Sequence, residues 1–158
     1  MINFNGELLQ ENEATLSITN RGYAYGDSVF ETIRVINGKV MFWEDHYFRL
    51  MASMRIMRME IPNEFSPEFL EEQIINLIRE NNLQDKPVRV KFSVFRKEGG
   101  LYTPEVRDIE YFILTSEIEH SFYTLNEDFY EVELFKDHYI NAGLLSTIKT
   151  NNKAVNVL

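Results

Sequence analysis

His46 and Arg49 lie three residues apart in a segment predicted to be helical, so their side chains share one face of that helix. Leu50 adjoins them, which predicts that this face is partly buried. A guanidinium held there could bind an anion through two hydrogen bonds, and phosphate is the natural candidate. The same spacing also fits a solvated helix face with an ordinary ion pair, because most helical His/Arg pairs are structural.

Lys149 is a second residue that could carry out chemistry. It follows an apolar stretch, and a lysine that is partly removed from water has a lowered pKa. Such an amine is a nucleophile that can form a Schiff base with a carbonyl compound. Lysines are common before helices, however, and Lys153, four residues further along, is a competing candidate.

Arg89 and Arg96 stand at the two ends of one predicted strand, and their separation of seven residues places them on opposite faces. Arg96 continues the apolar face of this strand and leads into a Gly-Gly loop at residues 99–100. The position fits a clamp for a carboxylate, and it fits equally well a charge that reaches solvent at a strand end.

Tyr25 belongs to a short segment, residues 20–27, that contains two glycines and two tyrosines. The composition predicts a shaped loop before a strand, and loops on rigid scaffolds often carry functional sites. Tyr25 could present its hydroxyl to a pocket. A turn with packed aromatic rings is an alternative of at least equal weight.

Turn signals and hydrophobic periodicity indicate the elements that position these residues. Asn-Gly pairs at residues 5–6 and 37–38 predict two β-hairpins. Alternation predicts strands over 29–36, 88–95 and 109–115 and resumes at 130–134, while helical spacing marks 44–59 and 66–82. We therefore expect an α+β fold: a small N-terminal domain of hairpin-rich antiparallel sheet with two helices at residues 1–117. Residues 118–158 are expected to be a linker and the truncated start of a C-terminal domain.

Composition excludes several classes of protein. The 158 residues carry a net charge of −9 with no basic stripe, which argues against nucleic-acid binding. The chain has no cysteine, which removes disulfides and thiolate chemistry, and its three histidines lack the spacing of metal ligands. No signal peptide and no apolar run long enough for a membrane span are apparent. We expect a cytoplasmic protein with no metal site and no membrane partner.

Four segments in order resemble the class IV (fold-type IV) pyridoxal-phosphate enzymes, which include branched-chain aminotransferases, D-amino-acid aminotransferases and aminodeoxychorismate lyases. They are residues 20–35 (NRGYAYGDSVFETIRV), His46-x-x-Arg49-Leu50, Arg96 with residues 99–102 (GGLY), and residues 149–152 (KTNN). The first segment is specific, and the second follows at the right distance. The resemblance covers essentially the whole chain.

The resemblance implies a role for each candidate residue. Lys149 is similar to the lysine that forms the Schiff base with pyridoxal 5'-phosphate, the cofactor that acidifies the substrate Cα–H bond. Arg49 is similar to the arginine that holds the cofactor phosphate, and Tyr25 to a tyrosine lining the substrate pocket. Arg96 matches a carboxylate-binding arginine of the D-amino-acid branch, and Arg89 a substrate-side arginine of the branched-chain branch. These two assignments conflict, and the position of Arg96 before the loop favours Arg96.

The resemblance predicts an aminotransferase that moves an amino group between an amino acid and a 2-oxo acid and assembles as a homodimer. Family members have a second domain after the lysine, whereas this sequence ends nine residues beyond Lys149, so a fragment is expected. A lyase with the same cofactor is an alternative that Leu101 disfavours, because lyases often have a second arginine there. A catalytically silent dimerisation or binding domain is the alternative from another class.

Overall fold

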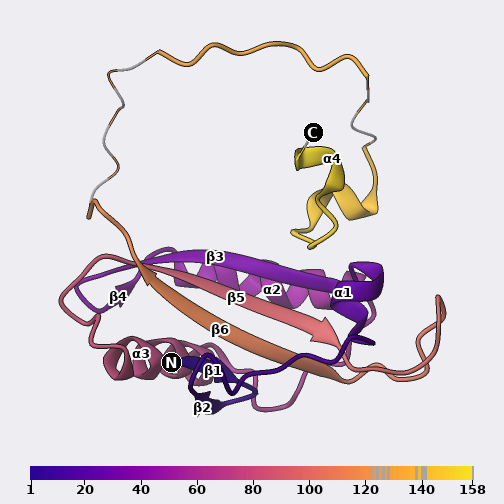
Figure 1. The fold of residues 1–158 in the computed structure, drawn as a ribbon, viewed down its shortest axis with the longest axis horizontal. Helices are drawn as coiled ribbons and strands as arrows, with labels where there is room; N and C mark the ends of the chain where they lie inside the picture. The colour runs from indigo at the N-terminus through magenta and orange to yellow at the C-terminus, as the bar shows by residue number, and fades with distance from the viewer. Residues whose placement is uncertain are drawn as a thin grey trace.

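The computed structural model describes the whole chain except residues 122, 124, 126, 128, 138, 140, 141 and 158 and the side chain of residue 155. The elements follow one another along the chain (Figure 1), and their bounds are β1 Ile2–Phe4, β2 Glu7–Leu9, α1 Arg21–Tyr25, β3 Ser28–Ile36, β4 Lys39–Val40, α2 Trp43–Ile56, α3 Pro67–Glu80, β5 Val88–Arg96, β6 Ile109–Glu117, a 3-10 turn at Leu144–Thr147 and α4 Ala154–Val157.

The strands form one antiparallel sheet in the order β2-β1-β6-β5-β3-β4. Both predicted hairpins are present, β1 with β2 and β3 with β4. Their turn residues Asn5, Gly6, Asn37 and Gly38 all have positive φ, from 50° to 89°, as a tight two-residue hairpin turn requires. The α+β class and the hairpin-rich sheet are therefore confirmed.

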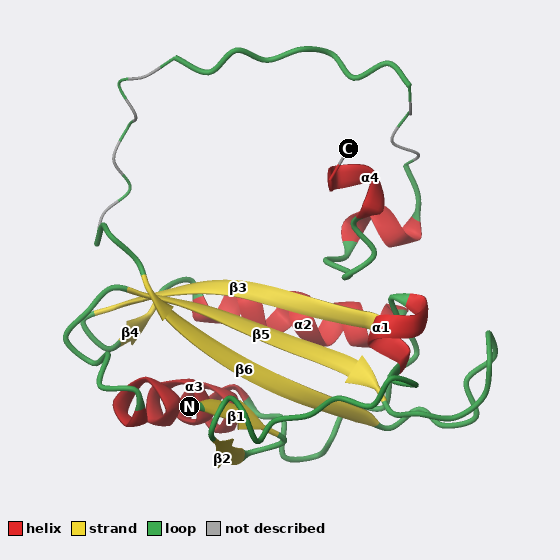
Figure 2. Ribbon diagram, in the orientation of Figure 1, coloured by secondary structure: helices red, strands yellow, loops and turns green. Residues whose placement is uncertain are grey.

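Helix α2 packs on β3 and lies behind it in Figure 2, while α3 packs on β6 and β1 and also contacts α2, so the two helices cover the same side of the sheet. Helix α3 begins where predicted, because the Ser66 hydroxyl accepts a hydrogen bond from the Phe69 amide at 3.1 Å and Pro67 takes the first helical position. The apolar stripe of α3 then packs on the alternate residues of the strands, and the buried core includes Val29, Ile33, Leu50, Met54, Leu70, Ile74, Leu77, Val90, Phe92 and Ile113.

Two short helices were not predicted. Helix α1 lies inside residues 20–27, where a loop was expected, because the Asn20 side chain accepts from the Tyr23 amide at 3.1 Å and Gly26 ends the helix with φ 64°. Helix α4 lies in the C-terminal segment, outside residues 1–117 for which the two helices were expected. Residues 130–134 form no strand, and their apolar side chains are exposed. Strand β6 ends at Glu117, and the division into two domains there stays a prediction.

After β6 the chain returns to the edge of β3 (Figure 1). The Phe30 amide donates to the Lys149 carbonyl at 2.9 Å, and the Asn151 amide donates to the Ser28 carbonyl at 3.1 Å. Strand β4 pairs with the far end of β3, at Val35 and Ile36, which leaves this part of the edge available. The return thus places Lys149 beside the start of β3. In the part of the chain that the structure describes, no helix has the length and apolarity needed to cross a membrane.

Candidate active site

A buried carboxylate connects β3 with α2. Alternation along β3 points Glu31 toward the helices, together with Val29 and Ile33, and its side chain is 1% exposed. Arg49 of α2 donates to it twice, from Nε to Oε1 at 2.6 Å and from Nη2 to Oε2 at 2.5 Å. His46 Nδ1 lies 2.8 Å from Oε2. The predicted pairing of His46 and Arg49 on one helix face is thus present, and Glu31 is their common partner.

These contacts set the charge of the cluster. Burial by itself raises the pKa of Glu31, but the hydrogen bonds from Arg49 and His46 outweigh it, so the pKa lies below its ordinary value. The hydrogen bonds from Arg49 to Glu31 raise the pKa of Arg49. At neutral pH the pair is therefore a carboxylate and a guanidinium, and the Arg49 side chain stays 45% exposed beside it.

Lys149 lies against the neighbouring part of β3. Its ammonium nitrogen is 4.9 Å from the centre of the Phe30 ring, on the sheet face opposite to the helices. Burial is the largest effect on Lys149 and lowers its pKa. The negative charge of Glu31 raises the pKa, whereas the positive charges of Arg49, Lys153 and Arg89 lower it, so the pKa lies below its ordinary value. A lysine with this environment has a larger neutral fraction than an exposed lysine, which is what a nucleophilic amine needs.

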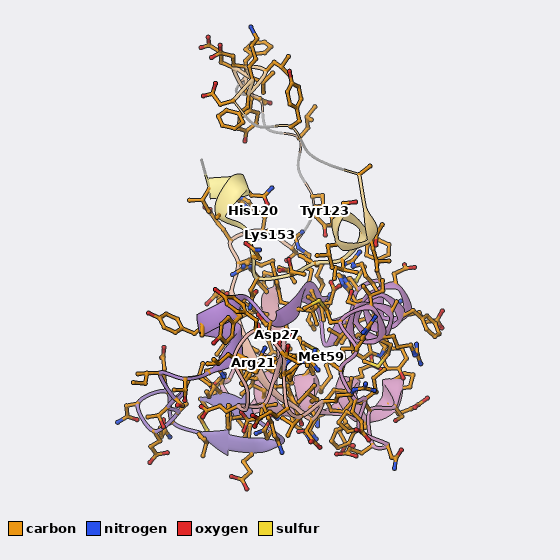
Figure 3. All side chains as sticks on the ribbon, turned by 90° about the vertical axis from the view of Figure 1, so that its right-hand side faces the viewer. Arg21, Asp27, Met59, His120, Tyr123 and Lys153 are labelled. Carbon is orange, nitrogen blue, oxygen red and sulfur yellow. The ribbon has the colours of Figure 1, made fainter. Side chains whose placement is uncertain are left out.

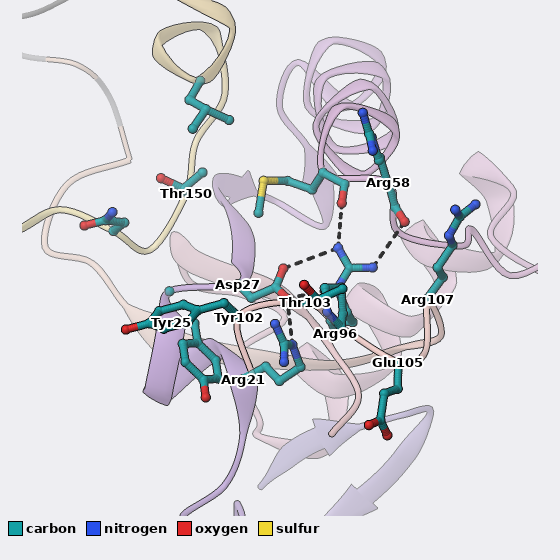
Figure 4. A pocket seen from close by; sticks show the side chains of 15 residues that line it. Arg21, Tyr25, Asp27, Arg58, Arg96, Tyr102, Thr103, Glu105, Arg107 and Thr150 are labelled. Carbon is teal, nitrogen blue, oxygen red and sulfur yellow. Dashed lines mark hydrogen bonds and ion pairs between the residues drawn. The ribbon is translucent and has the colours of Figure 1, made fainter. Parts of the chain in front are cut away.

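A second cluster joins α1, the residue before β3 and the end of β5. The Asp27 carboxylate accepts from Arg21 Nε and from Arg96 Nε, each at 2.9 Å, and the three side chains are at most 10% exposed. Figure 3 shows Arg21 and Asp27 inside the packed body of the protein. Arg96 also donates to the carbonyls of Met57 at 2.5 Å and Arg58 at 3.1 Å (Figure 4). These contacts tie the end of α2 to the start of β3.

Arg21 extends this cluster into the Gly-Gly loop. Its Nη1 lies within 2.7 to 3.2 Å of the carbonyl oxygens of Gly99, Gly100 and Leu101. The Tyr25 ring lies 4.8 Å from the Arg21 guanidinium and 5.6 Å from the ring of Tyr102. The cluster lines one side of a pocket of about 710 Å³, and Figure 4 shows Tyr25, Asp27, Arg96 and Thr150 among the residues that line it.

The predicted site residues thus fall into two groups. Tyr25 and Arg96 line the large pocket, although most of the Arg96 donors are already used by Asp27 and two carbonyls. Arg49 and Lys149 lie beside the first half of β3, whereas Arg89 pairs with Arg34 toward its far end and acts on Lys149 through its charge. Arg89 is exposed on the open face of the sheet, opposite Arg34 in the register, and it lines a smaller hollow with His46. The roles assigned to these five residues stay predictions.

Three residues with central contacts were missed as individual candidates: Arg21, Asp27 and Glu31. The signal for Glu31 was present, because it has the same parity as Val29, Ile33 and Val35 and an acid on a buried face needs a cationic partner. Asp27 and Arg21 carried no comparable signal, since their shared contacts depend on β5 and on the loop after it.

Comparison with known proteins identifies the group to which these features belong. The model of the family "Amino-transferase class IV" matches residues 28–158. D-alanine aminotransferase of Listeria monocytogenes is 39% identical over 79 residues, which cover 50% of this chain and 27% of that protein. A putative branched-chain-amino-acid aminotransferase of Methanocaldococcus jannaschii is 34% identical over 89 residues, covering 56% of this chain and 30% of that protein.

Solved structures give the same result for the fold. The branched-chain amino acid aminotransferase of Escherichia coli superposes with a TM-score of 0.65 and 27% identity, over 74% of this chain and 39% of that one. A second branched-chain amino acid aminotransferase, from T.th. and solved with pyridoxamine 5'-phosphate, gives a TM-score of 0.66 and 29% identity, over 75% of this chain and 40% of that one. The chain thus spans well under half the length of these relatives, and the resemblance indicated by the sequence motifs is confirmed.

Proposed function

The chain belongs to the class IV aminotransferase family, and we propose that it is part of an enzyme that uses pyridoxal 5'-phosphate to transfer an amino group between an amino acid and a 2-oxo acid. The observation that carries this proposal is the placement of Lys149 and Arg49 around the same stretch of β3. One supplies an amine with a lowered pKa, and the other supplies an exposed guanidinium whose charge reaches that amine.

The residues present fit this cofactor. Lys149 offers an amine for the aldehyde, and Arg49 offers a planar pair of donors suited to a phosphate. The Phe30 ring beside Lys149 provides an apolar surface for a pyridine ring. When bound, pyridoxal 5'-phosphate supplies an electron-accepting ring that makes the Cα–H bond of an amino acid acidic.

Lys149 has a further role in this proposal, because its lowered pKa suits it to accept and return a proton at the substrate carbon. Tyr25 and Arg96 border the large pocket, and the charge of Arg89 acts on Lys149, so we place the substrate between these two groups. Within the described residues, the Arg89 guanidinium has no hydrogen bond or ion pair, whereas Arg96 is largely occupied. This difference favours Arg89 as the arginine with donors available for a substrate carboxylate.

The relatives named above are aminotransferases, which supports amino-group transfer over elimination by a lyase.

We propose also that the protein acts as a homodimer in the cytoplasm. The exposed apolar side chains between β6 and the 3-10 turn, among them Leu125, Phe129 and Val132, support a surface that another protein segment covers. The absence of cysteine agrees with a reducing compartment.

Covalent capture of the cofactor tests the proposal. The chain is incubated with pyridoxal 5'-phosphate, reduced with borohydride and digested, and the labelled lysine is identified by mass spectrometry. We expect the label on Lys149, its loss in Lys149→Ala, and its retention in the matched control Lys153→Ala. A label spread over surface lysines, unchanged by Lys149→Ala, would refute the proposal and favour a catalytically silent binding domain.

A further inference from the structure

Glu31 is an unusual residue for its position, because every other described side chain on its face of β3 is apolar. Val29, Ile33 and Val35 share that face and are at most 2% exposed. An apolar residue at position 31 would fill the same space without removing a charge from water, which is costly for a carboxylate. The carboxylate therefore needs a reason beyond core packing.

The hydrogen bonds of Arg49 indicate that reason. Glu31 occupies one edge of the guanidinium, formed by Nε and Nη2. The remaining nitrogen, Nη1, has no partner among the residues that the structure describes. An arginine on an exposed helix face would otherwise sample many rotamers. With one edge fixed by a buried carboxylate, the other edge is held in a single direction.

His46 keeps the carboxylate itself in place. Its Nδ1 lies 2.8 Å from Glu31 Oε2, and Arg49 Nη2 lies 3.3 Å from the same Nδ1. One turn further along α2, the Ser53 hydroxyl donates to the Arg49 carbonyl at 2.7 Å. The guanidinium of Arg49 is thus oriented by Glu31 of β3 and by His46 on its own helix, while Ser53 contacts only the Arg49 main chain.

We propose that Glu31 is a positioning residue, which holds Arg49 so that its Nη1 edge receives the phosphate group of the cofactor. This inference rests on the proposed function, because it assigns the phosphate to Arg49. Glu31 itself bears a negative charge and does not touch the phosphate. Its effect is to reduce the rotamer freedom that Arg49 would lose on binding, which makes binding of a phosphorylated ligand tighter.

The test compares two ligands that differ only in the phosphate, pyridoxal 5'-phosphate and pyridoxal. Their affinities are measured by absorption or fluorescence titration of the chain. Glu31→Gln keeps the size of the side chain, but its amide group turns a donor toward a donor of Arg49, so the fixed edge is lost. We expect the affinity for pyridoxal 5'-phosphate to fall about tenfold or more, the effect of one lost charge-assisted hydrogen bond, with little change for pyridoxal.

Two variants make the result specific. Arg49→Lys removes the fork and should lower the same affinity. Glu117→Gln is the matched control, because Glu117 is an exposed partner of Lys86 on β6, and it should leave both affinities unchanged. An equal loss for both ligands in Glu31→Gln, with a lower melting temperature, would mean a structural role only and would overturn the inference.

The remaining outcomes separate the inference from its premise. If Glu31→Gln binds both ligands like the unaltered chain while Arg49→Lys weakens the phosphorylated ligand, the inference is wrong and the proposed function stands. If the unaltered chain does not prefer the phosphorylated ligand, or Arg49→Lys changes nothing, the phosphate assignment fails and the inference with it.

Discussion

Replacing Asp27 by alanine should destabilise the protein more than any exposed charge change. Asp27 is the shared acceptor of Arg21 and Arg96, whose side chains are 3% and 4% exposed. Without it, two buried guanidinium groups keep their charge and lose their counter-ion. Removing one partner of a buried ion pair costs about 3–5 kcal/mol, so we expect a loss of at least this size in the free energy of unfolding.

The assay is equilibrium unfolding in urea, followed by circular dichroism, for Asp27→Ala, Arg96→Met and the double variant. Because Asp27 and Arg96 contact each other directly, the double variant should lose less than the sum of the single variants, by about 1–3 kcal/mol. The matched control is the pair Lys86 and Glu117, which are 47% and 51% exposed. Its coupling should be about 0–1 kcal/mol.

The reasoning would be refuted by additivity at the buried pair. If Asp27→Ala costs no more than Glu117→Ala, or if its effect adds fully to that of Arg96→Met, the carboxylate does not compensate the two arginines. Solvent would then reach the cluster, and the wall of the pocket would be less firmly held than its contacts indicate.

Three further predictions concern single residues. Because the pKa of Glu31 is lowered in the folded protein, its ionised form stabilises the fold at pH values above the ordinary pKa of 4.5. The difference in stability between the unaltered chain and Glu31→Gln should therefore be largest near pH 7 and shrink as the pH falls below about 4.5, as acid unfolding curves would show. A difference that stays constant with pH would contradict this. Because its pKa is lowered, Lys149 should react with an amine-modifying reagent at lower pH than the exposed lysines do. Peptide mass spectrometry over a series of pH values would measure this. If the extent of modification of Lys149 depended on pH in the same way as that of the exposed lysines, its pKa would not be lowered. Gly100→Ala should destabilise the protein more than Gly38→Ala in urea unfolding. Both glycines have φ of +72°, but a Cβ at Gly100 would collide with the carbonyl oxygen of Thr103, whereas a Cβ at Gly38 would meet open space. Equal losses in the free energy of unfolding would mean that the loop moves to make room for the Cβ.

The parts of the fold that were predictable have local causes. Helix α3 followed from its serine cap, its proline and its apolar stripe, and both hairpins followed from Asn-Gly turns. These signals lie within a few residues of the structure they determine. Helix α1 has only five residues, including a glycine and two tyrosines, so it shows no apolar periodicity, and its cap became apparent only with the structure.

The candidate site was predictable to a lesser degree for a similar reason. The pairing of His46 with Arg49 followed from helical spacing, and the acid that joins them could have been inferred from the alternation of β3. The position of Lys149 could not have been inferred in this way. It depends on two main-chain hydrogen bonds, one between Phe30 and Lys149 and one between Asn151 and Ser28. Main-chain contacts between segments over a hundred residues apart leave no side-chain pattern in the sequence.

The pairing of residues 149–151 with β3 also affects how copies of this protein meet one another. A free strand edge offers its amides and carbonyls to any other chain, which is a common route to aggregation. Here the returning segment occupies the first part of that edge, and β4 occupies the last part. The segment that contains Lys149 therefore also protects the sheet from intermolecular strand addition. Removal of residues 149–151 should therefore lower the solubility of the protein as well as remove Lys149.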